Sequence, residues 1–326
     1  MKHVVIDEGS SQTKMAWLQD GKIQTAVIPS RVVDGTKFDS DSYHSGAYKL
    51  DGFMEYTVDG FLDGALTTDI QDYQTSDLNL LLVHDVLRQN GFGGEDVAIY
   101  VTLPIEDYYQ KNDDGIKNLP LINKKKDNLM RTDIKNMAGH SLANIVKVSV
   151  LAEAIPAWFD KLLNSQGEEQ IENDESYKIM VVDHGGTTVD IAIINGAGSI
   201  QEEHSIRTGV FNIQKNLSEI LKKRFDRSVI ETHHIEKAIQ SGQFNKEDIS
   251  EEIIKACKPI ERDVLYQMKK MVSDADSLDA VLYAGGGAEL TAKRLADQYG
   301  GTAIKGNQFS VCCGILKGLI SQGIIE

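Results

Sequence analysis

Two stretches of the chain share a pattern in which an apolar run ends on an acid, passes through a polar turn and then resumes. Near the start the pattern reads 4-VVIDEGSSQTKMAWLQDGKIQ-24, and in the second half it reads 180-MVVDHGGTTVDIAIINGAGSIQ-201. The spacing is constant from the acids Asp7 and Asp183 to Ala16 and Ala192. Each copy predicts a strand, an acidic turn, a strand, a glycine-containing turn and a strand. A repeat this widely spaced predicts two related α/β domains rather than a solenoid.

The patterns after each hairpin are those of alternating helices and strands. In the first half, Ser76 can cap a helix with an apolar face, and short strands are predicted at 96–104 and 145–151. In the second half, a helix with apolar residues three and four apart begins near Gly209, and 278-LDAVLYAGGGAEL-290 predicts a strand, a turn and a helix. Both halves therefore combine one hairpin with further α/β elements.

The polar stretches suggest where the domains begin and end. Residues 30–60 are turn-rich and β-like, which predicts a small subdomain inserted into the first domain. The stretch 164-NSQGEEQIENDES-176 is acidic and carries a single strong apolar residue, which is typical of a hinge. The expected division is domain I at 1–165, with an insertion at about 30–75 and a final helix at about 308–326, and domain II at 177–307.

The chemistry of the two turns points to a phosphate ligand. Glycines and hydroxyls at a hairpin tip present backbone N–H groups, which favour anions and allow close approach. The acids Asp7 and Asp183 would repel phosphate unless a divalent cation lay between the carboxylates and the phosphate, so the pattern implies Mg²⁺. Lys14 is expected on the next strand, with its charge directed at the phosphates. The glycine turn 285–287 would allow a base and sugar to approach the backbone.

Composition narrows the classes of function. The net charge of −15 argues against direct binding to nucleic acid. The basic cluster Lys124–Lys126 is interpreted as a solvated helix face. Three cysteines without a CxxC spacing indicate a reduced, cytoplasmic setting. The sequence has no run of 18 apolar residues, so no membrane span is expected. The eight histidines are expected to be structural or on the surface.

The motifs DEGSSQTK, VLAEAIPAW, VVDHGGTTVDIA and LYAGGGAEL, in this order, resemble those of the actin/sugar-kinase/chaperone ATPase superfamily. The chain is more closely similar to the ParM (StbA) family of bacterial actins, which segregate plasmids. The segments 62-LDGALTTDIQDYQTSDLNLLLVHDVLR-88 and 101-VTLPIEDYY-109 favour this family over more distant relatives. The resemblance implies an actin-like ATPase fold, with two related α/β domains around a nucleotide cleft and ATP (or GTP) with Mg²⁺ as the cofactors.

The resemblance also implies roles for individual residues. Glu153 is expected to orient the attacking water, although an acid near the start of a helix is also favoured by the helix dipole. Asp7 and Asp183 are expected to hold Mg²⁺ through water, and Asp183 is counted with Glu153 as catalytic. Base-contacting residues in the helix at 208–224 are left unassigned. The remaining nucleotide-binding residues are Gly9, Ser10, Ser11 and Lys14 in the first loop, Gly185, Gly186, Thr187 and Thr188 in the second, and Gly285, Gly286 and Gly287 in the adenosine loop.

The function that the resemblance implies is nucleotide-dependent filament formation that segregates plasmid DNA. The expected partners are further copies of the chain and a DNA-binding adaptor protein, with no direct nucleic-acid contact and no membrane. A small-molecule kinase of the same superfamily is the main alternative, and it would need an acceptor pocket and an acid that activates the acceptor. A chaperone-like switch and a membrane-anchored shape actin are less favoured, because no substrate domain and no basic amphipathic tail is seen in the sequence.

Overall fold

The computed structural model describes residues 1–40, 42–110 and 116–325. The chain divides into two compact units, Met1–Glu172 with Phe309–Glu326 and Asn173–Gln308. The division falls inside the acidic stretch 164–176, and the C-terminal segment belongs to the first unit. Residue 41 of the expected insertion and Glu326 of the expected final helix lie outside the described residues.

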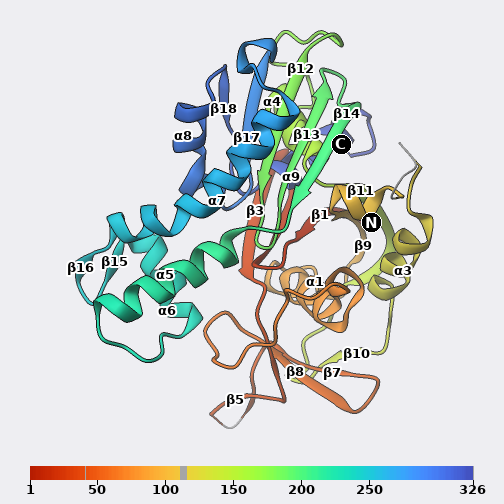
Figure 1. Ribbon diagram of the computed structural model, residues 1–326. Coiled ribbons are helices and arrows are strands. Elements are labelled where there is room, and N and C mark those ends of the chain that lie inside the picture. Colours follow the sequence, from red (N-terminus) through yellow and green to blue (C-terminus); the bar gives the residue numbers. More distant parts are fainter. Residues whose placement is uncertain (41, 111–115, 326) are drawn as a thin grey trace. The chain divides into compact units, whose positions relative to one another are not determined.

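A five-stranded sheet in the order β11-β9-β1-β2-β3 forms the centre of the first unit (Figure 1). Its strands are β1 (Lys2–Glu8), β2 (Gln12–Gln19), β3 (Lys22–Pro29), β9 (Asp96–Leu103) and β11 (Asn144–Ala152). The first three strands form an antiparallel meander, whereas β9 runs parallel to both β1 and β11. Because β1 and β9 are buried on both faces, they carry continuous apolar runs.

Helices cover this sheet and complete its core. They are η1 (Tyr73–Thr75), α1 (Asp77–Gln89), α2 (Ile105–Tyr108), α3 (Leu119–Leu129), α4 (Ile155–Leu162) and α9 (Ser310–Ser321). Ser76 caps α1 as predicted, because its hydroxyl accepts from the amide of Asn79. The final helix, α9, packs closely on α4: a Cβ at Gly314 would overlap the carbonyl oxygen of Pro156. Both tryptophans of the chain, Trp17 and Trp158, lie in this unit.

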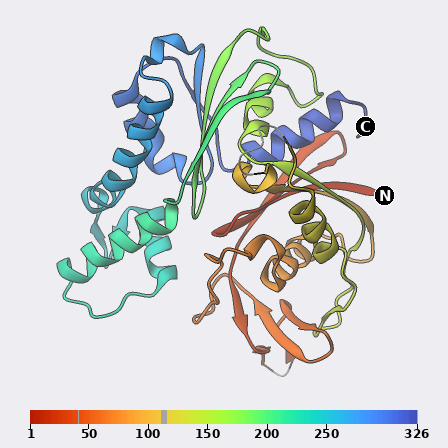
Figure 2. The same cartoon turned by 45° about the vertical axis from the view of Figure 1, so that its right-hand side comes forward.

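The small subdomain of the first unit is β-rich over residues 30–60, as the sequence predicted, but one strand of its sheet, β10, comes from residues 134–136, outside the predicted insertion. A four-stranded sheet has the order β10-β7-β8-β4, and β5 pairs with β6 in a separate two-stranded ribbon. The orange arrows at the bottom of Figure 2 are strands of this subdomain. The bounds are β4 (Val32–Asp34), β5 (Phe38–Asp39), β6 (Ser42–Tyr43), β7 (Ala47–Leu50), β8 (Met54–Val58) and β10 (Ile134–Asn136). The small sheet rests on α1 through buried residues such as Tyr48 and Leu50.

The sheet of the second unit repeats the topology of the first. Its order is β14-β13-β12-β17-β18, with an antiparallel meander followed by parallel pairs from β12 to β17 and from β17 to β18. The strands are β12 (Lys178–His184), β13 (Val189–Asn195), β14 (Ile200–Ile206), β17 (Ala280–Ala284) and β18 (Ala303–Lys305). The internal repeat inferred from the two hairpins is therefore confirmed at the level of the fold.

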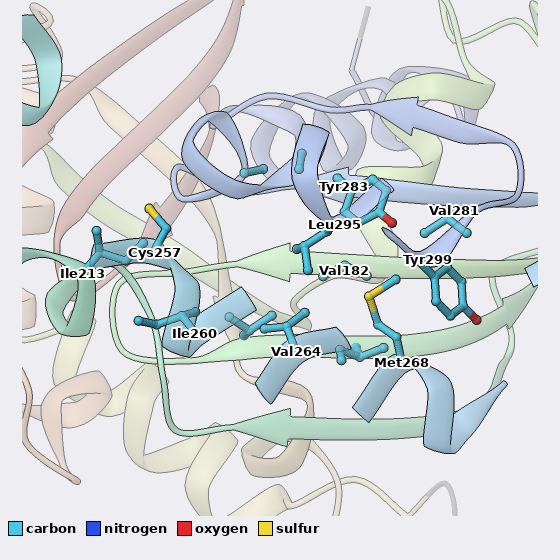
Figure 3. Packing of buried hydrophobic residues seen from close by; sticks show 14 of the residues in the cluster. Val182, Ile213, Cys257, Ile260, Val264, Met268, Val281, Tyr283, Leu295 and Tyr299 are labelled. Carbon is cyan, nitrogen blue, oxygen red and sulfur yellow. The ribbon is translucent and has the colours of Figure 1, made fainter. Parts of the chain in front are cut away.

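The second unit buries its sheet against one face of a long helix, α7. Along α7, Ile260, Val264 and Met268 lie in one buried cluster with Val182 of the sheet and Leu295 of α8 (Figure 3). The other elements are α5 (Val210–Arg224), α6 (Thr232–Ser241), β15 (Gln243–Phe244), β16 (Glu247–Asp248), α7 (Ser250–Met271), η2 (Ala275–Ser277) and α8 (Ala288–Tyr299). Within the described part of the chain, no helix combines the length and apolar character needed to cross a membrane.

Candidate functional site

The first glycine turn joins β1 to β2, and the register of the two strands sets its chemistry. Asp7 and Lys14 are cross-strand partners, and the Lys14 ammonium lies 2.8 Å from Oδ2 of Asp7. Both residues are largely buried, at 7 % and 8 % exposure, so this pair is shielded from solvent. A Cβ at Gly9 would lie 2.9 Å from the carbonyl oxygen of Gln12, so this tight turn favours glycine.

Hydroxyl groups from distant segments hold this turn in place. Ser30 donates to the carbonyl oxygen of Gly9 at 2.6 Å, and Thr68 donates to that of Ser10 at 2.6 Å. The amide of Ser30 donates to the carbonyl of Ser11 at 3.0 Å. Three successive carbonyls thus bond to protein donors, which fixes the backbone of the turn. The roles of Ser30 and Thr68 were missed in the sequence, because nothing local marks a contact so far along the chain.

The second glycine turn joins β12 to β13, and a helix N-terminus supports it. Asp183 and Asp190 are cross-strand partners, so the second hairpin has an acid where the first has Lys14. Amides at the start of α5 donate to the turn: Val210 to the carbonyl of Gly185 at 3.1 Å and Phe211 to that of Gly186 at 3.0 Å.

Two further contacts define this second turn. Thr188 donates from its hydroxyl to Asp190 at 2.9 Å. A Cβ at Gly209, just before α5, would lie 2.5 Å from the carbonyl oxygen of Gly186. The helix can therefore approach this closely only because residue 209 is glycine. The neighbouring Thr187 is half-buried in the same turn.

The third glycine turn, Gly285–Gly287, lies directly against the second. Gly285 has φ +84°, and a Cβ there would overlap the carboxylate of Asp183. The amide of Gly287 donates to the carbonyl oxygen of His184 at 2.9 Å. Gly286 lies between them and is half-buried. The structure thus brings the expected residues of the second and third turns together within one unit.

His184 fills the space beneath the third turn. It is buried, its Nδ1 lies 2.8 Å from the hydroxyl of Thr291, and a Cβ at Gly287 would lie 2.9 Å from its ring. Burial lowers its pKa to about 4, so the imidazole is neutral at physiological pH. This is the structural role that the sequence suggested for it.

Glu153 lies between β11 and α4 rather than within the helix. Its amide donates to the carbonyl of Leu103 at 2.9 Å, and its side-chain Oε1 accepts from the hydroxyl of Thr102 at 3.1 Å. The next residue, Ala154, is not glycine but has φ +64°. The amide of Ile155 donates back to the carbonyl of Glu153 at 2.8 Å, which closes a strained three-residue turn.

A buried ion pair lies next to this segment, and it corrects the interpretation of the basic cluster. Lys125 is fully buried, and its ammonium lies 2.9 Å from Oε1 of the fully buried Glu8. Only its neighbours fit a solvated face, since Lys124 is exposed and Lys126 is half-buried. The sequence does hold a signal, because Ile122, Lys125 and Leu129 have the spacing of one helix face.

Among the described residues, no cluster of three or more histidine, cysteine or acidic side chains could hold a metal directly. Asp7 and Asp183 supply carboxylate oxygens, the ligand type that Mg²⁺ prefers, and each is the penultimate residue of a buried strand that leads into a glycine turn.

Three solved structures share the fold of the chain. A non-polymerisable quadruple mutant of pCBH ParM has a TM-score of 0.74 and 19% identity over 97% of this chain and 98% of its own. A 15-stranded ParM filament from Clostridium botulinum has a TM-score of 0.73 and 19% identity over 98% and 99%. The archaeal actin homologue Ta0583, in complex with ADP, has a TM-score of 0.74 and 17% identity over 100% of both chains. The fold is therefore actin-like.

Family models assign the chain more closely. A model described as "Archaeal actin homologue MreB-like, C-terminal" matches residues 181–297. A search of the curated proteins found no match. A second family model, described as "Plasmid segregation protein ParM, N-terminal", matches residues 1–164, which is half of the sequence. The chain therefore belongs to the ParM (StbA) family of actin-like proteins.

Proposed function

We propose that the chain binds and hydrolyses a nucleoside triphosphate, ATP or GTP, with Mg²⁺. The observation that carries this proposal is the repeated hairpin. In each unit, the equivalent strand of the five-stranded sheet ends with a buried acid and a glycine turn. Family membership supports it, and the related Ta0583 was solved with ADP.

The proposed roles follow the chemistry of each group. Backbone amides of the turns 9–11 and 186–188 would bind phosphate oxygens, since the amide of Gly185 already donates to the carbonyl of Thr188. The turn 285–287 would accept the nucleoside. Lys14, which contacts Asp7 at 2.8 Å, would exchange this contact for one with phosphate, because an ammonium group can bind either anion. Asp7 and Asp183 would hold Mg²⁺ through water, and the cation when bound would neutralise phosphate charge.

Glu153 is proposed to orient the attacking water. Hydrolysis of a terminal phosphate requires mainly positioning and charge neutralisation, and a carboxylate can align the water and accept its hydrogen bond. The hydroxyl of Thr102 on Oε1 and the backbone bonds on either side fix where this carboxylate lies. We count Asp183 with it as catalytic through the metal.

Nucleotide turnover is proposed to control assembly into filaments. Head-to-tail contacts between identical subunits give open filaments rather than closed rings, and a ParM filament is among the structures with this fold. The triphosphate state would favour growth and hydrolysis would favour disassembly, because the two nucleotides make different contacts.

The biological role proposed for these filaments is the segregation of plasmid DNA. The description of the matched family names plasmid segregation, and the net charge of −15 disfavours direct contact with DNA. A DNA-binding adaptor protein is therefore the proposed partner at the filament ends. The family match does not favour the small-molecule kinase that the superfamily resemblance left open.

Light scattering of the purified protein tests the proposal. Scattering with the Mg²⁺ form of ATP should rise and then decay as phosphate is released, whereas ADP or no nucleotide should give no rise. Glu153→Ala should rise without decaying. Glu95→Ala should behave as wild type, because Glu95 is an exposed acid that precedes the first residue of β9. Thr102, which contacts Glu153, lies near the last residue of this strand. A wild-type protein that binds ATP but neither scatters nor releases phosphate would overturn the proposal.

A further inference from the structure

The buried pair of Glu8 and Lys125 needs an explanation other than stability. Both side chains are fully buried, and the ammonium lies 2.9 Å from the carboxylate. Desolvation of two charges offsets much of their attraction, so apolar residues of similar size often serve equally well. A buried pair is more informative when its remaining hydrogen bonds converge on one place, as they do here.

The bonds of this pair converge on the peptide groups of Thr102. The amide of Thr102 donates to Oε2 of Glu8 at 3.2 Å, and its carbonyl accepts from the Lys125 ammonium at 2.6 Å. Lys125 also donates to Oε1 of Gln74, and Nε2 of Gln74 donates to the carbonyl of Glu8 at 3.4 Å. The ammonium therefore makes two hydrogen bonds and one ion pair, and these three contacts hold the charge in place.

Thr102 links the ion pair to Glu153, the proposed catalytic acid. It is the penultimate residue of β9, and its hydroxyl donates to Oε1 of Glu153 at 3.1 Å. A β-branched side chain has few rotamers for a given backbone, so a fixed peptide also fixes the direction of the hydroxyl. The strained turn at Ala154 holds Glu153 from its other side.

We propose that the Glu8–Lys125 pair, acting through the hydroxyl of Thr102, positions the carboxylate of Glu153 for hydrolysis. This inference rests on the proposed function of Glu153. Glu8, Lys125 and Thr102 are positioning residues, since they act through the carboxylate of Glu153. Displacing a reacting group by about 1 Å can cost on the order of 100-fold in rate. The network should therefore affect the hydrolysis step and leave nucleotide affinity unchanged.

The test uses Thr102→Val, which removes the hydroxyl and keeps the shape and the backbone bonds. Single-turnover hydrolysis, with protein in excess over ATP, should be slowed about 10- to 100-fold. The dissociation constant of a fluorescent ATP analogue should change less than about twofold. Thr102→Ser keeps the hydroxyl and should restore most of the rate. In a Glu153→Ala background, Thr102→Val should cause no further loss, because it acts through the missing carboxylate.

Two comparisons separate positioning from a general loss of stability. Tyr48→Phe removes a buried hydroxyl that donates to Asp85 at 2.7 Å in the same unit, and it should leave hydrolysis unchanged. The double variant Glu8→Gln/Lys125→Met removes both buried charges together, and it should slow hydrolysis as Thr102→Val does.

The outcomes distinguish this inference from the proposed function. If Glu153→Ala abolishes hydrolysis but Thr102→Val does not slow it, the positioning role is wrong and the proposed function stands. If Thr102→Val slows hydrolysis but the folded double variant does not, the ion pair has no part in positioning. If the wild type does not hydrolyse ATP, or Glu153→Ala leaves the rate unchanged, the proposed function itself fails.

Discussion

Replacing Lys125 by methionine would leave the carboxylate of Glu8 buried without its counter-ion. Breaking a buried pair on one side costs about 3 to 5 kcal/mol, because the remaining charge stays desolvated. The carboxylate can reduce this cost by taking up a proton. Burial raises the pKa of Glu8, and the charge of Lys125 opposes part of that rise. The substitution removes this opposing charge, so the pKa of Glu8 should rise further. We expect Lys125→Met to destabilise the first unit strongly at pH 7.5.

The loss should shrink as the pH falls. A carboxyl group whose pKa is raised on folding contributes stability that is present below its unfolded pKa and is lost as pH rises through the folded pKa. One proton is worth about 1.36 kcal/mol per pH unit. Between pH 7.5 and 5.5, Lys125→Met should therefore recover up to about 2.7 kcal/mol relative to wild type. The double variant Glu8→Gln/Lys125→Met has no acid to protonate and should not recover.

Equilibrium urea unfolding followed by tryptophan fluorescence measures this directly. Both tryptophans of the chain, Trp17 and Trp158, lie in the first unit, so the signal reports the unit that holds the ion pair. A loss below about 1 kcal/mol for the single variant, or an equal loss at both pH values, would refute the reasoning about an uncompensated buried carboxylate.

Three further predictions use other features of the fold. Gly314→Ala should destabilise the first unit by more than about 2 kcal/mol, because its Cβ would overlap the backbone of α4. Gly318→Ala lies in the same helix with open space around it and should stabilise the unit by about 0.5 to 1 kcal/mol. Equal urea midpoints for the two variants would contradict this prediction. Gly285→Ala should weaken binding of a fluorescent ATP analogue at least about tenfold, because φ +84° is strained for alanine and the Cβ would displace Asp183; unchanged affinity would exclude a role for this turn. Burial lowers the pKa of His84 to about 4, so the stability that its neutral form contributes is present above pH 6.5 and is lost as pH falls towards 4. His84→Leu should remove about 3 kcal/mol of that decline, and parallel pH curves for variant and wild type would contradict it.

Local sequence was enough to predict the repeated framework. The apolar runs before Asp7 and Asp183 are long and regular. Each is followed by glycine, which is typical of a tight hairpin turn. A buried strand that ends on an acid is informative without any partner in view. This is why the two sheets, the helix capped by Ser76 and the β-rich insertion could be predicted from the residue pattern, and why the family resemblance was visible in the motif order.

The support around the candidate residues could not be predicted in the same way, since it depends on contacts between distant segments. Thr68 reaches the first turn across 58 residues, and Thr102 reaches Glu153 across 51. Lys125 shows the limit most clearly, because a run of three lysines is usually solvated. Successive residues on a helix point about 100° apart, so only the packing of α3 decides which lysine is buried. The sequence alone determined the framework and the acids at the ends of its strands. The tertiary structure decided which distant hydroxyls and charges hold those groups in place, because such contacts leave no periodic pattern along the chain.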